Sequence, residues 1–191
     1  MPAERIIFMG DSAGGMSAIQ SLPSIQYVSV DSATGGLSLL SSTELLRRGL
    51  PQPAASVLIS PWIDMSLSAY EGGNPLVETD FLVAANQNVP GITKMFLGSH
   101  SGSDPEVNPL FSNSEELKGL NPQLILIGGA EFCHQDGRDL AVLCRRAGVK
   151  HELVCEWGQL HVYALGSKWI DPEVRERTDA KIVDWIKAAI L

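Results

Sequence analysis

A serine stands at the centre of a short glycine-bounded motif, where residues 10–14 read Gly-Asp-Ser-Ala-Gly. The apolar residues 6–9 come directly before it and have the composition of a β-strand. A strand followed by Gly-x-Ser-x-Gly is typical of a nucleophile elbow, a tight turn that lifts a serine hydroxyl above a sheet. Neighbouring backbone crowds the positions two before and two after the serine, so these residues must lack bulk. The alternative is a glycine-rich surface turn with an idle serine.

The elbow would give its members different tasks. Ser12 is the candidate nucleophile, and the backbone N–H of Ala13, at the start of a helix, would point at a developing oxyanion. A second, poorer copy of the motif surrounds Ser32, with Val30 and Thr34 in the places of the two glycines. We therefore rank Ser32 far below Ser12 as a nucleophile. The remaining elbow residues are Gly10, Asp11, Gly14 and Gly15.

A serine hydroxyl becomes a useful nucleophile only beside a base, and the base needs an orienting carboxylate. His161 is the best candidate base because it follows the last expected strand on a glycine-containing loop, and His134 ranks second. Glu131 is the best candidate acid because it stands directly after Gly-Gly-Ala at the end of a strand, with Asp136 as the runner-up. Alternatively, Glu131 is simply a carboxylate that interacts with a helix dipole.

The apolar pattern predicts alternating strands and helices. The strands are expected at residues 6–9, 55–59, 123–127 and 152–155, and the main helices at 37–48, 132–146 and 172–189. This alternation is typical of a parallel sheet in an α/β fold. Sites in such sheets lie beyond the carboxyl ends of the strands. Ser12, Glu131 and His161 each come just after an expected strand.

Residues 65–120 contain no clean strand pattern. Turn-forming clusters interrupt the segment, and two short helices are expected near residues 80–87 and 90–97. A long segment of this kind in a compact domain is more often a lid or cap than an idle loop. We therefore expect residues 1–191 to form a single domain with a cap at 65–120.

Composition narrows the class of protein. The net charge of −8 and the lack of a basic run argue against a nucleic-acid partner. No apolar stretch approaches the roughly 20 residues that span a bilayer. The three cysteines suit neither a disulfide framework nor the spacing of a zinc site. Buried free thiols, no secretion signal and a cytoplasmic location are therefore the expectation.

Several motifs together resemble the hormone-sensitive-lipase-like carboxylesterases of the α/β hydrolase fold-3 type. The matching segments are residues 10–15, Leu-Ile-Ser-Pro-Trp-Ile-Asp at 58–64, Asn-Pro-Leu-Phe at 108–111, Gly-Gly-Ala-Glu at 128–131 and His-Val-Tyr at 161–163. The resemblance implies an α/β-hydrolase fold and hydrolysis of a small or short-acyl ester. It also implies Ser12 as nucleophile, His161 as base and Glu131 as acid, with no metal or organic cofactor. The family more often has Asp at the acid position.

The sequence departs from this family in two places. The family has a His-Gly-Gly-Gly oxyanion loop well before the serine, whereas only a few residues precede the elbow here. We therefore expect a fold truncated at its N-terminus, with an open sheet edge that could join two copies. Residues 16–35 also lack a counterpart, and joining Gly15 to Gly36 would restore an unbroken elbow and helix. Our hypothesis is that residues 16–35 are a translated intron, and the alternative is a genuine insertion. In either case we expect the helix behind Ser12 to be displaced.

These observations leave two functions open. The first is a carboxylic ester hydrolase that acts through an acyl-enzyme on Ser12. The second is a catalytically impaired fragment or pseudoenzyme that serves as a binding module or has no function. Retention of Ser12, Glu131 and His161 favours the first, and the lack of the oxyanion loop favours the second.

Overall fold

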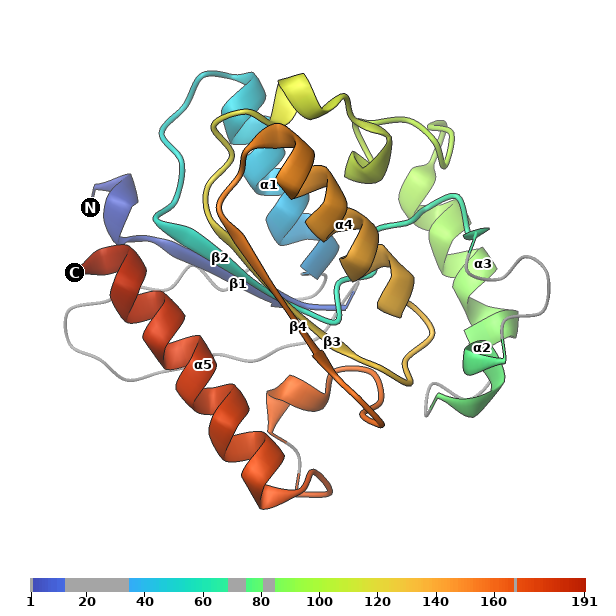
Figure 1. Cartoon of the computed structure of the whole chain (residues 1–191). Helices are drawn as coiled ribbons and strands as arrows, with labels where there is room; N and C mark the ends of the chain where they lie inside the picture. The colour runs from blue at the N-terminus through green and yellow to red at the C-terminus, as the bar shows by residue number, and fades with distance from the viewer. Residues whose placement is uncertain (1, 13–34, 69–74, 81–84, 167) are drawn as a thin grey trace.

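Four parallel strands form the centre of the computed structural model, which describes residues 2–12, 35–68, 75–80, 85–166 and 168–191. The strands are β1 (Ile7–Asp11), β2 (Ala55–Ile59), β3 (Gln123–Gly128) and β4 (His151–Glu156), and they lie side by side in that order (Figure 1). The predicted parallel sheet is therefore confirmed. Because all four strands point the same way, their carboxyl ends meet at one edge of the sheet.

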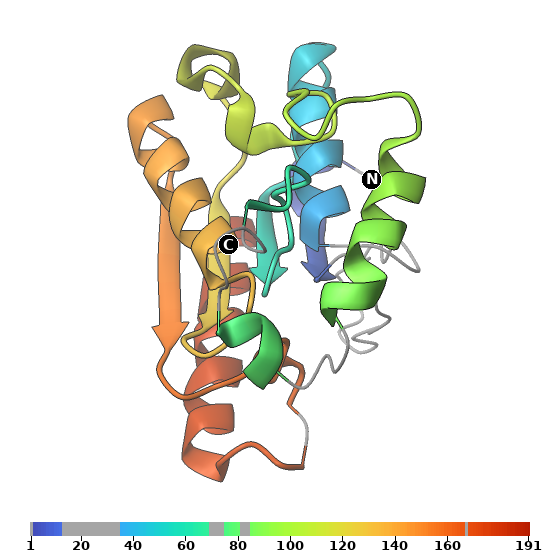
Figure 2. The same ribbon diagram turned by 90° about the vertical axis from the view of Figure 1, so that its right-hand side faces the viewer.

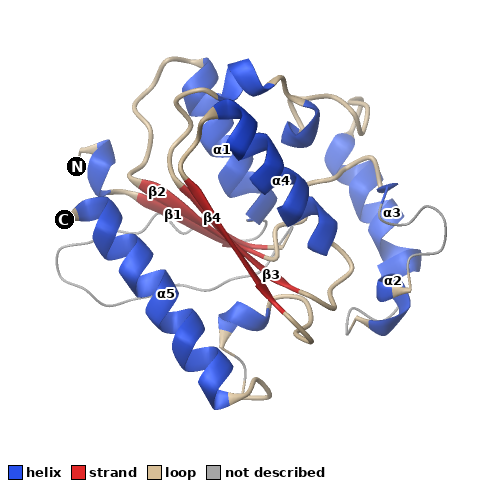
Figure 3. Cartoon of the chain, in the orientation of Figure 1, coloured by secondary structure: helices blue, strands red, loops and turns tan. Residues whose placement is uncertain are grey.

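Helices cover both faces of the sheet. Figure 3 shows α1 (Gly35–Arg47) and α4 (His134–Ala147) on one face and α5 (Pro172–Ile190) on the other. The start of α5 agrees with its sequence signals, because the Asp171 side chain accepts a hydrogen bond from the Glu173 amide and Pro172 opens the helix. Within the described part of the chain, no helix is long and apolar enough to cross a membrane.

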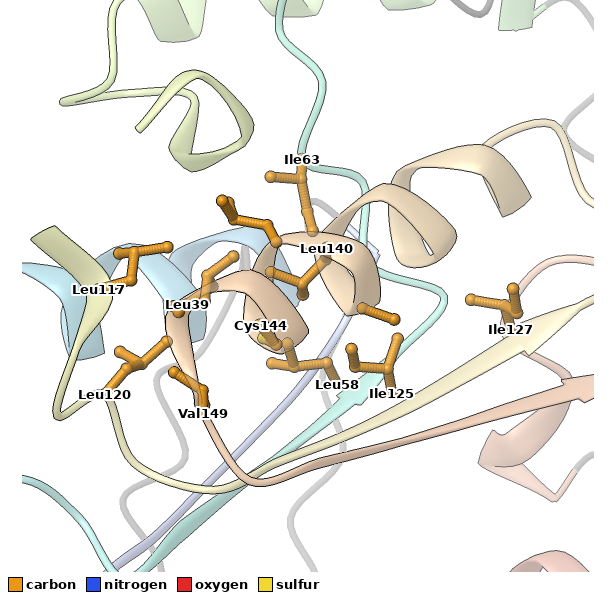
Figure 4. Close-up of a cluster of buried hydrophobic side chains, with 13 residues drawn as sticks. Leu39, Leu58, Ile63, Leu117, Leu120, Ile125, Ile127, Leu140, Cys144 and Val149 are labelled. Carbon is orange, nitrogen blue, oxygen red and sulfur yellow. The ribbon is translucent and has the colours of Figure 1, made fainter. Parts of the chain in front are cut away.

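The strands are apolar on both faces because each face packs on helices. Leu58 of β2 and Ile125 of β3 point toward α1 and α4, where they join the cluster in Figure 4 that includes Leu140. Their neighbours Val57 and Leu124 point the other way and pack against α5. All five side chains are buried. A strand buried on both faces reads as a continuous apolar run, which is the pattern that predicted β2 and β3.

The predicted cap segment lies to one side of the sheet. It contains α2 (Leu76–Thr79), α3 (Ala85–Leu97) and two short 3-10 turns, η3 (Pro109–Phe111) and η4 (Ser114–Leu117). Figure 2, viewed from that side, shows α2 and α3 in front of the sheet. The expectation of separate helices near 80–87 and 90–97 is wrong, since α3 continues through Pro90. A proline inside a helix removes one backbone hydrogen bond, and here that loss does not end the helix.

Asp136, in the first turn of α4, holds the loop that follows β2. Its Oδ2 atom accepts hydrogen bonds from the amides of Ile63 and Asp64, both at 2.8 Å. The Asp64 carboxylate in turn accepts from Ser66 and Ser68, which fixes the entry to the cap segment. Burial raises the pKa of the Asp136 carboxyl to about 7, against the opposing effect of the two amides. Asp136 therefore has a structural role at this position.

Replacing Asp136 by Asn should change how stability depends on pH. The pKa of Asp136 is higher in the folded state, about 7, than its usual 3.8. Its protonation therefore stabilises the fold fully below pH 3.8, and this contribution is lost as the pH rises through 7. The Asn carbonyl oxygen can accept both amides without ionising. Asp136→Asn should raise the melting temperature at pH 8 by several degrees relative to wild type, and change it little at pH 4.

Asp136→Ala provides the matched control for this prediction. It removes the acceptor, so the Ile63 and Asp64 amides lose their partner, and it should be destabilising at both pH values by about 1–3 kcal/mol or more. Thermal denaturation of the three proteins across pH 4–8 gives the comparison. A wild-type and an Asn variant with parallel pH profiles would contradict the role given to the Asp136 carboxyl.

Candidate active site

Ser12 follows the last residue of β1 and has an unusual backbone conformation. Its φ angle is 45°, in the left-handed region that residues other than glycine rarely adopt. Its amide donates a hydrogen bond to the carbonyl of Ile59 at the end of β2, at 2.9 Å. A strained residue directly after a strand is the geometry of a nucleophile elbow. Gly10 and Asp11 are the last two residues of β1, and Asp11 is buried.

Helix α1 begins directly against Ser12, although many residues separate the two in sequence. The amides of Gly35 and Gly36 donate to the Ser12 carbonyl at 3.0 and 3.3 Å. A Cβ on Gly36 would lie 2.7 Å from the Trp62 carbonyl oxygen, so only glycine fits there. The expectation of a displaced helix is therefore wrong, because the first two residues of α1 are in direct contact with Ser12. The sequence analysis placed Gly35 at the end of the insert, whereas the structure makes it the first residue of α1.

Some of the predicted site residues lie outside the described part of the chain. They are Ala13, Gly14, Gly15, the alternative nucleophile Ser32, and insert residues 16–34. The described residues on either side of positions 13–34 are Ser12 and Gly35, which are in contact.

The structure brings the imidazole of His161 to the Ser12 hydroxyl. The distance from His161 Nε2 to Ser12 Oγ is 2.6 Å, across 149 positions of sequence. His161 lies in the loop after β4, is buried, and packs its ring against Phe132 with ring centres 5.1 Å apart. His134, the second-ranked base, is instead the first residue of α4. A ring with its proton on Nδ1 could accept the Ser12 proton at Nε2.

Glu131 faces the opposite side of the same imidazole. Its Oε2 atom lies 3.3 Å from His161 Nδ1, and both side chains are shielded from solvent. Burial raises the pKa of the Glu131 carboxyl, and the hydrogen bond with His161 opposes this rise. The thiol of Cys133 also approaches Nδ1, with Sγ at 3.4 Å. The predicted acid, base and nucleophile are thus in series, whereas Asp136 binds the loop after β2.

Close backbone contacts hold the acid loop against the histidine loop. The Ala130 amide donates to the Gln159 carbonyl at 3.0 Å, and the Gly129 amide donates to the Glu156 carbonyl at 2.8 Å. A Cβ on Gly128 would lie only 2.4 Å from the Gln159 carbonyl oxygen. The Gly-Gly sequence before Glu131 therefore has a physical reason, because a side chain at Gly128 would push the two loops apart.

Asp80 joins the cap segment to both loops, and the sequence analysis did not identify it. Its Oδ2 atom accepts from the Phe132 amide at 3.0 Å, and its Oδ1 atom accepts from the His161 amide at 3.3 Å. The side chain is buried. A second strained residue, Ser60 with φ 46°, supports the histidine loop by accepting the Val162 amide at its hydroxyl, at 2.8 Å. Backbone amides leave no mark in a sequence pattern, so neither role was predictable from spacing.

The sequence profile of the alpha/beta hydrolase fold family matches residues 23–165. The chain therefore belongs to the α/β hydrolase fold family. The matched region includes Glu131 and His161 and begins after Ser12. It also includes Ser32 and residues 23–35, so the expectation that residues 16–35 lack a counterpart in the family is wrong for that part of the segment. The resemblance to hormone-sensitive-lipase-like esterases is confirmed by sequence relatives and by solved structures.

Among curated proteins, an acetyl-hydrolase of Streptomyces hygroscopicus is 32% identical over 149 residues, which are 76% of this chain and 46% of the relative. An esterase of Acinetobacter venetianus is 26% identical over 149 residues, covering 78% of this chain and 48% of the relative. The chain thus spans about half the length of the curated relatives that it matches.

Solved structures of esterases are similar over nearly the whole chain. A hormone-sensitive lipase from a metagenome library superposes with a TM-score of 0.77 at 29% identity, covering 98% of this chain and 55% of that one. The hormone-sensitive-lipase homologue EstE7, also from a metagenome library, gives a TM-score of 0.78 at 29% identity, covering 99% and 56%. The expected α/β-hydrolase fold is confirmed by this agreement.

Removing the Asp80 carboxylate should loosen both loops of the site. In Asp80→Ala, the buried amides of Phe132 and His161 lose this acceptor, at about 1–3 kcal/mol each. We expect faster hydrogen exchange at these two amides, measured by NMR, and a fall of about 2–4 kcal/mol in the free energy of unfolding.

Asp104→Ala is the control for this prediction. Asp104 is also in the cap segment, but its carboxylate pairs with His100 near the surface. Its removal should change the free energy of unfolding by roughly 0.5 kcal/mol or less and should leave exchange at Phe132 and His161 unchanged. Equal effects of the two variants would refute a specific role for Asp80.

Proposed function

We propose that this chain hydrolyses carboxylic esters through an acyl-enzyme on Ser12. The observation that carries the proposal is the 2.6 Å contact between His161 Nε2 and the hydroxyl of a strained Ser12. Glu131, on the far side of the ring, supports the role of Ser12. The family and the esterase names of the relatives support ester hydrolysis, and the family match itself begins after Ser12. In this reading, Ser12 is the nucleophile, His161 the general base and Glu131 the orienting acid.

The reaction needs two transfers. Ser12 Oγ attacks the ester carbonyl carbon while His161 Nε2 takes the hydroxyl proton, and the Ala13 amide would bind the oxyanion. The tetrahedral intermediate collapses, the C–O bond to the alcohol breaks, and His161 gives its proton to the leaving oxygen. Water then attacks the acyl carbon while His161 Nε2 takes one of its protons. The bond between that carbon and Ser12 Oγ breaks, the acid is released, and His161 returns the proton to Ser12 Oγ. Glu131 stabilises the imidazolium in both steps.

A short acyl group is the proposed substrate preference. An apolar pocket extends from Gly36, whose amide contacts Ser12, to the cap helix α3. Trp62, Met65, Ile92 and Phe96 are among the residues that line it. A pocket lined by apolar side chains suits a small hydrophobic group. The name of the relative from Streptomyces, an acetyl-hydrolase, supports the same preference.

The remaining expectations are proposals of the same kind. We propose that residues 65–120 act as the cap over this pocket, within one domain that contains the whole chain. Cysteines Cys133, Cys144 and Cys155 are all free, which supports a reducing, cytoplasmic location. Among the described strands, β1 pairs with β2 alone, so its other edge supports the proposal of contact between copies of the chain.

Covalent labelling should identify the nucleophile. A fluorophosphonate probe should label the native chain, and Ser12→Ala should abolish both labelling and hydrolysis of p-nitrophenyl acetate. Ser32→Ala is the matched control, because Ser32 lies in the second copy of the motif. It should keep labelling within about twofold of wild type, since substitutions away from the reacting groups have small effects.

Two outcomes would overturn this proposal. Labelling that disappears in Ser32→Ala and survives in Ser12→Ala would assign the nucleophile to the other motif. No labelling of the folded wild-type chain would favour the alternative function, a binding module without catalysis.

The Glu131 carboxylate should matter mainly to the rate of reaction. Glu131→Gln keeps the size of the side chain but cannot stabilise the imidazolium, so kcat should fall by about 10³–10⁴-fold with a small change in KM. Glu131→Asp restores the charge at a shorter reach and should recover part of that loss. Steady-state kinetics on all three proteins gives the ratio, and a Gln variant with wild-type kcat would show that Glu131 is not the acid.

A further inference from the structure

Three metal-ligating side chains, one of them the candidate base, lie close together behind Ser12. They are the Glu131 carboxylate, the Cys133 thiol and the His161 imidazole, all buried, with their ligand atoms within 4.8 Å of one another. Two of these separations are short: His161 Nδ1 lies 3.4 Å from Cys133 Sγ and 3.3 Å from Glu131 Oε2. Ester hydrolysis gives a role to two of these groups, and none to the thiol.

These separations match those between neighbouring ligands of a tetrahedral zinc ion. With bonds of about 2.3 Å to sulfur and about 2.0–2.1 Å to nitrogen and oxygen, tetrahedral angles place sulfur and nitrogen about 3.5 Å apart, and nitrogen and oxygen about 3.4 Å apart. The observed distances of 3.4 and 3.3 Å are within about 0.2 Å of these values. These two pairs of ligand atoms would therefore need little change in separation to hold the ion.

The charge of the three ligands also suits a divalent cation. A buried ion is tolerated only when neighbouring groups compensate its charge. The Glu131 carboxylate and a Cys133 thiolate together carry two negative charges, which balance Zn²⁺. Thiolate, imidazole and carboxylate are all common ligands of this borderline-soft ion. Zinc ions held by three protein ligands commonly take water as the fourth ligand.

We propose that Glu131, Cys133 and His161 form an inhibitory zinc site. The ion would replace the Nδ1 proton of His161 and the thiol proton of Cys133, and both protons pass to solvent. With Nδ1 bound to the metal, His161 can no longer donate to Glu131. Coordination also withdraws electron density from the ring, so Nε2 becomes a weaker base for Ser12. The binding part of this inference stands alone, and its inhibitory part rests on the proposed function.

Cobalt binding tests the site independently of catalysis. Co²⁺ added to the purified full chain should produce a near-ultraviolet thiolate-to-metal charge-transfer band that saturates at one equivalent. Excess Zn²⁺ should remove the band by competition. Cys133→Ser should abolish it, with the affinity for Co²⁺ falling by more than about tenfold. Cys133→Ala provides a second variant without the Cys133 thiol, and circular dichroism checks that both are folded.

Residues elsewhere in the chain provide controls that test whether the cobalt band comes from the proposed site. Cys155→Ser should keep it, because Cys155 lies on β4 beside Arg138 and is not among the three ligands. Ser12→Ala should also keep it, because Ser12 contributes no ligand. The exposed group His100, Asp104 and Glu106 contains no thiol, so cobalt bound there would give no such band. Absence of the band in wild type, or its persistence in Cys133→Ser, would overturn the site.

Inhibition is tested separately with the fluorophosphonate probe. Saturating Zn²⁺ should slow labelling of the wild-type chain at least about tenfold, and a chelator should restore it. Labelling of Cys133→Ser, compared with its own metal-free rate, should resist Zn²⁺. Zinc that binds without slowing the labelling of an active wild-type chain would overturn the inhibitory part. A chain that shows the cobalt band but is never labelled would contradict the proposed function and leave the metal site standing.

Discussion

The buried carboxyl group of Glu131 is the constraint on which the arrangement of the site depends. An isolated carboxylate in a protein interior is strongly disfavoured, so its charge requires a close partner. His161 supplies that partner at 3.3 Å. The loop after β3 and the loop after β4 must therefore keep a fixed separation. Gly128 permits their close approach, and Asp80 binds an amide on each.

The parallel sheet then determines where chemistry can occur. Three strands that end at one edge bring together Ser12, Ser60 and Glu131 from distant parts of the sequence. Strained backbone accumulates there: Ser12, Ser60 and Val162 have φ angles of 45°, 46° and 54°. Such conformations persist only where surrounding contacts impose them, and here the packed strands supply those contacts. The rigid sheet thus fixes the orientation of the residues in the loops that follow its strands.

The sequence was sufficient to predict the strands and the three residues that the structure brings together. Apolar runs such as the one in β3 identify buried strands, and Ser12, Glu131 and His161 each follow one. Asp80 was missed because its partners are backbone amides, which every residue carries. The course of α3 through Pro90 and the contact of Ser12 with Gly35 were missed for a related reason. Local propensity and distance along the chain say little about which segments meet in space.

The return of the chain to Ser12 has a consequence for how such a protein can change over generations. Ser12 and Gly35, on either side of residues 13–34, are in contact, with the Gly35 amide 3.0 Å from the Ser12 carbonyl. The entropic penalty of joining two such points through a flexible connection grows only by about 0.6 kcal/mol per doubling of its length. Selection for a stable fold therefore constrains the length of this span only weakly. Lineages can gain or lose residues there while the strand and the helix that flank it keep their contact.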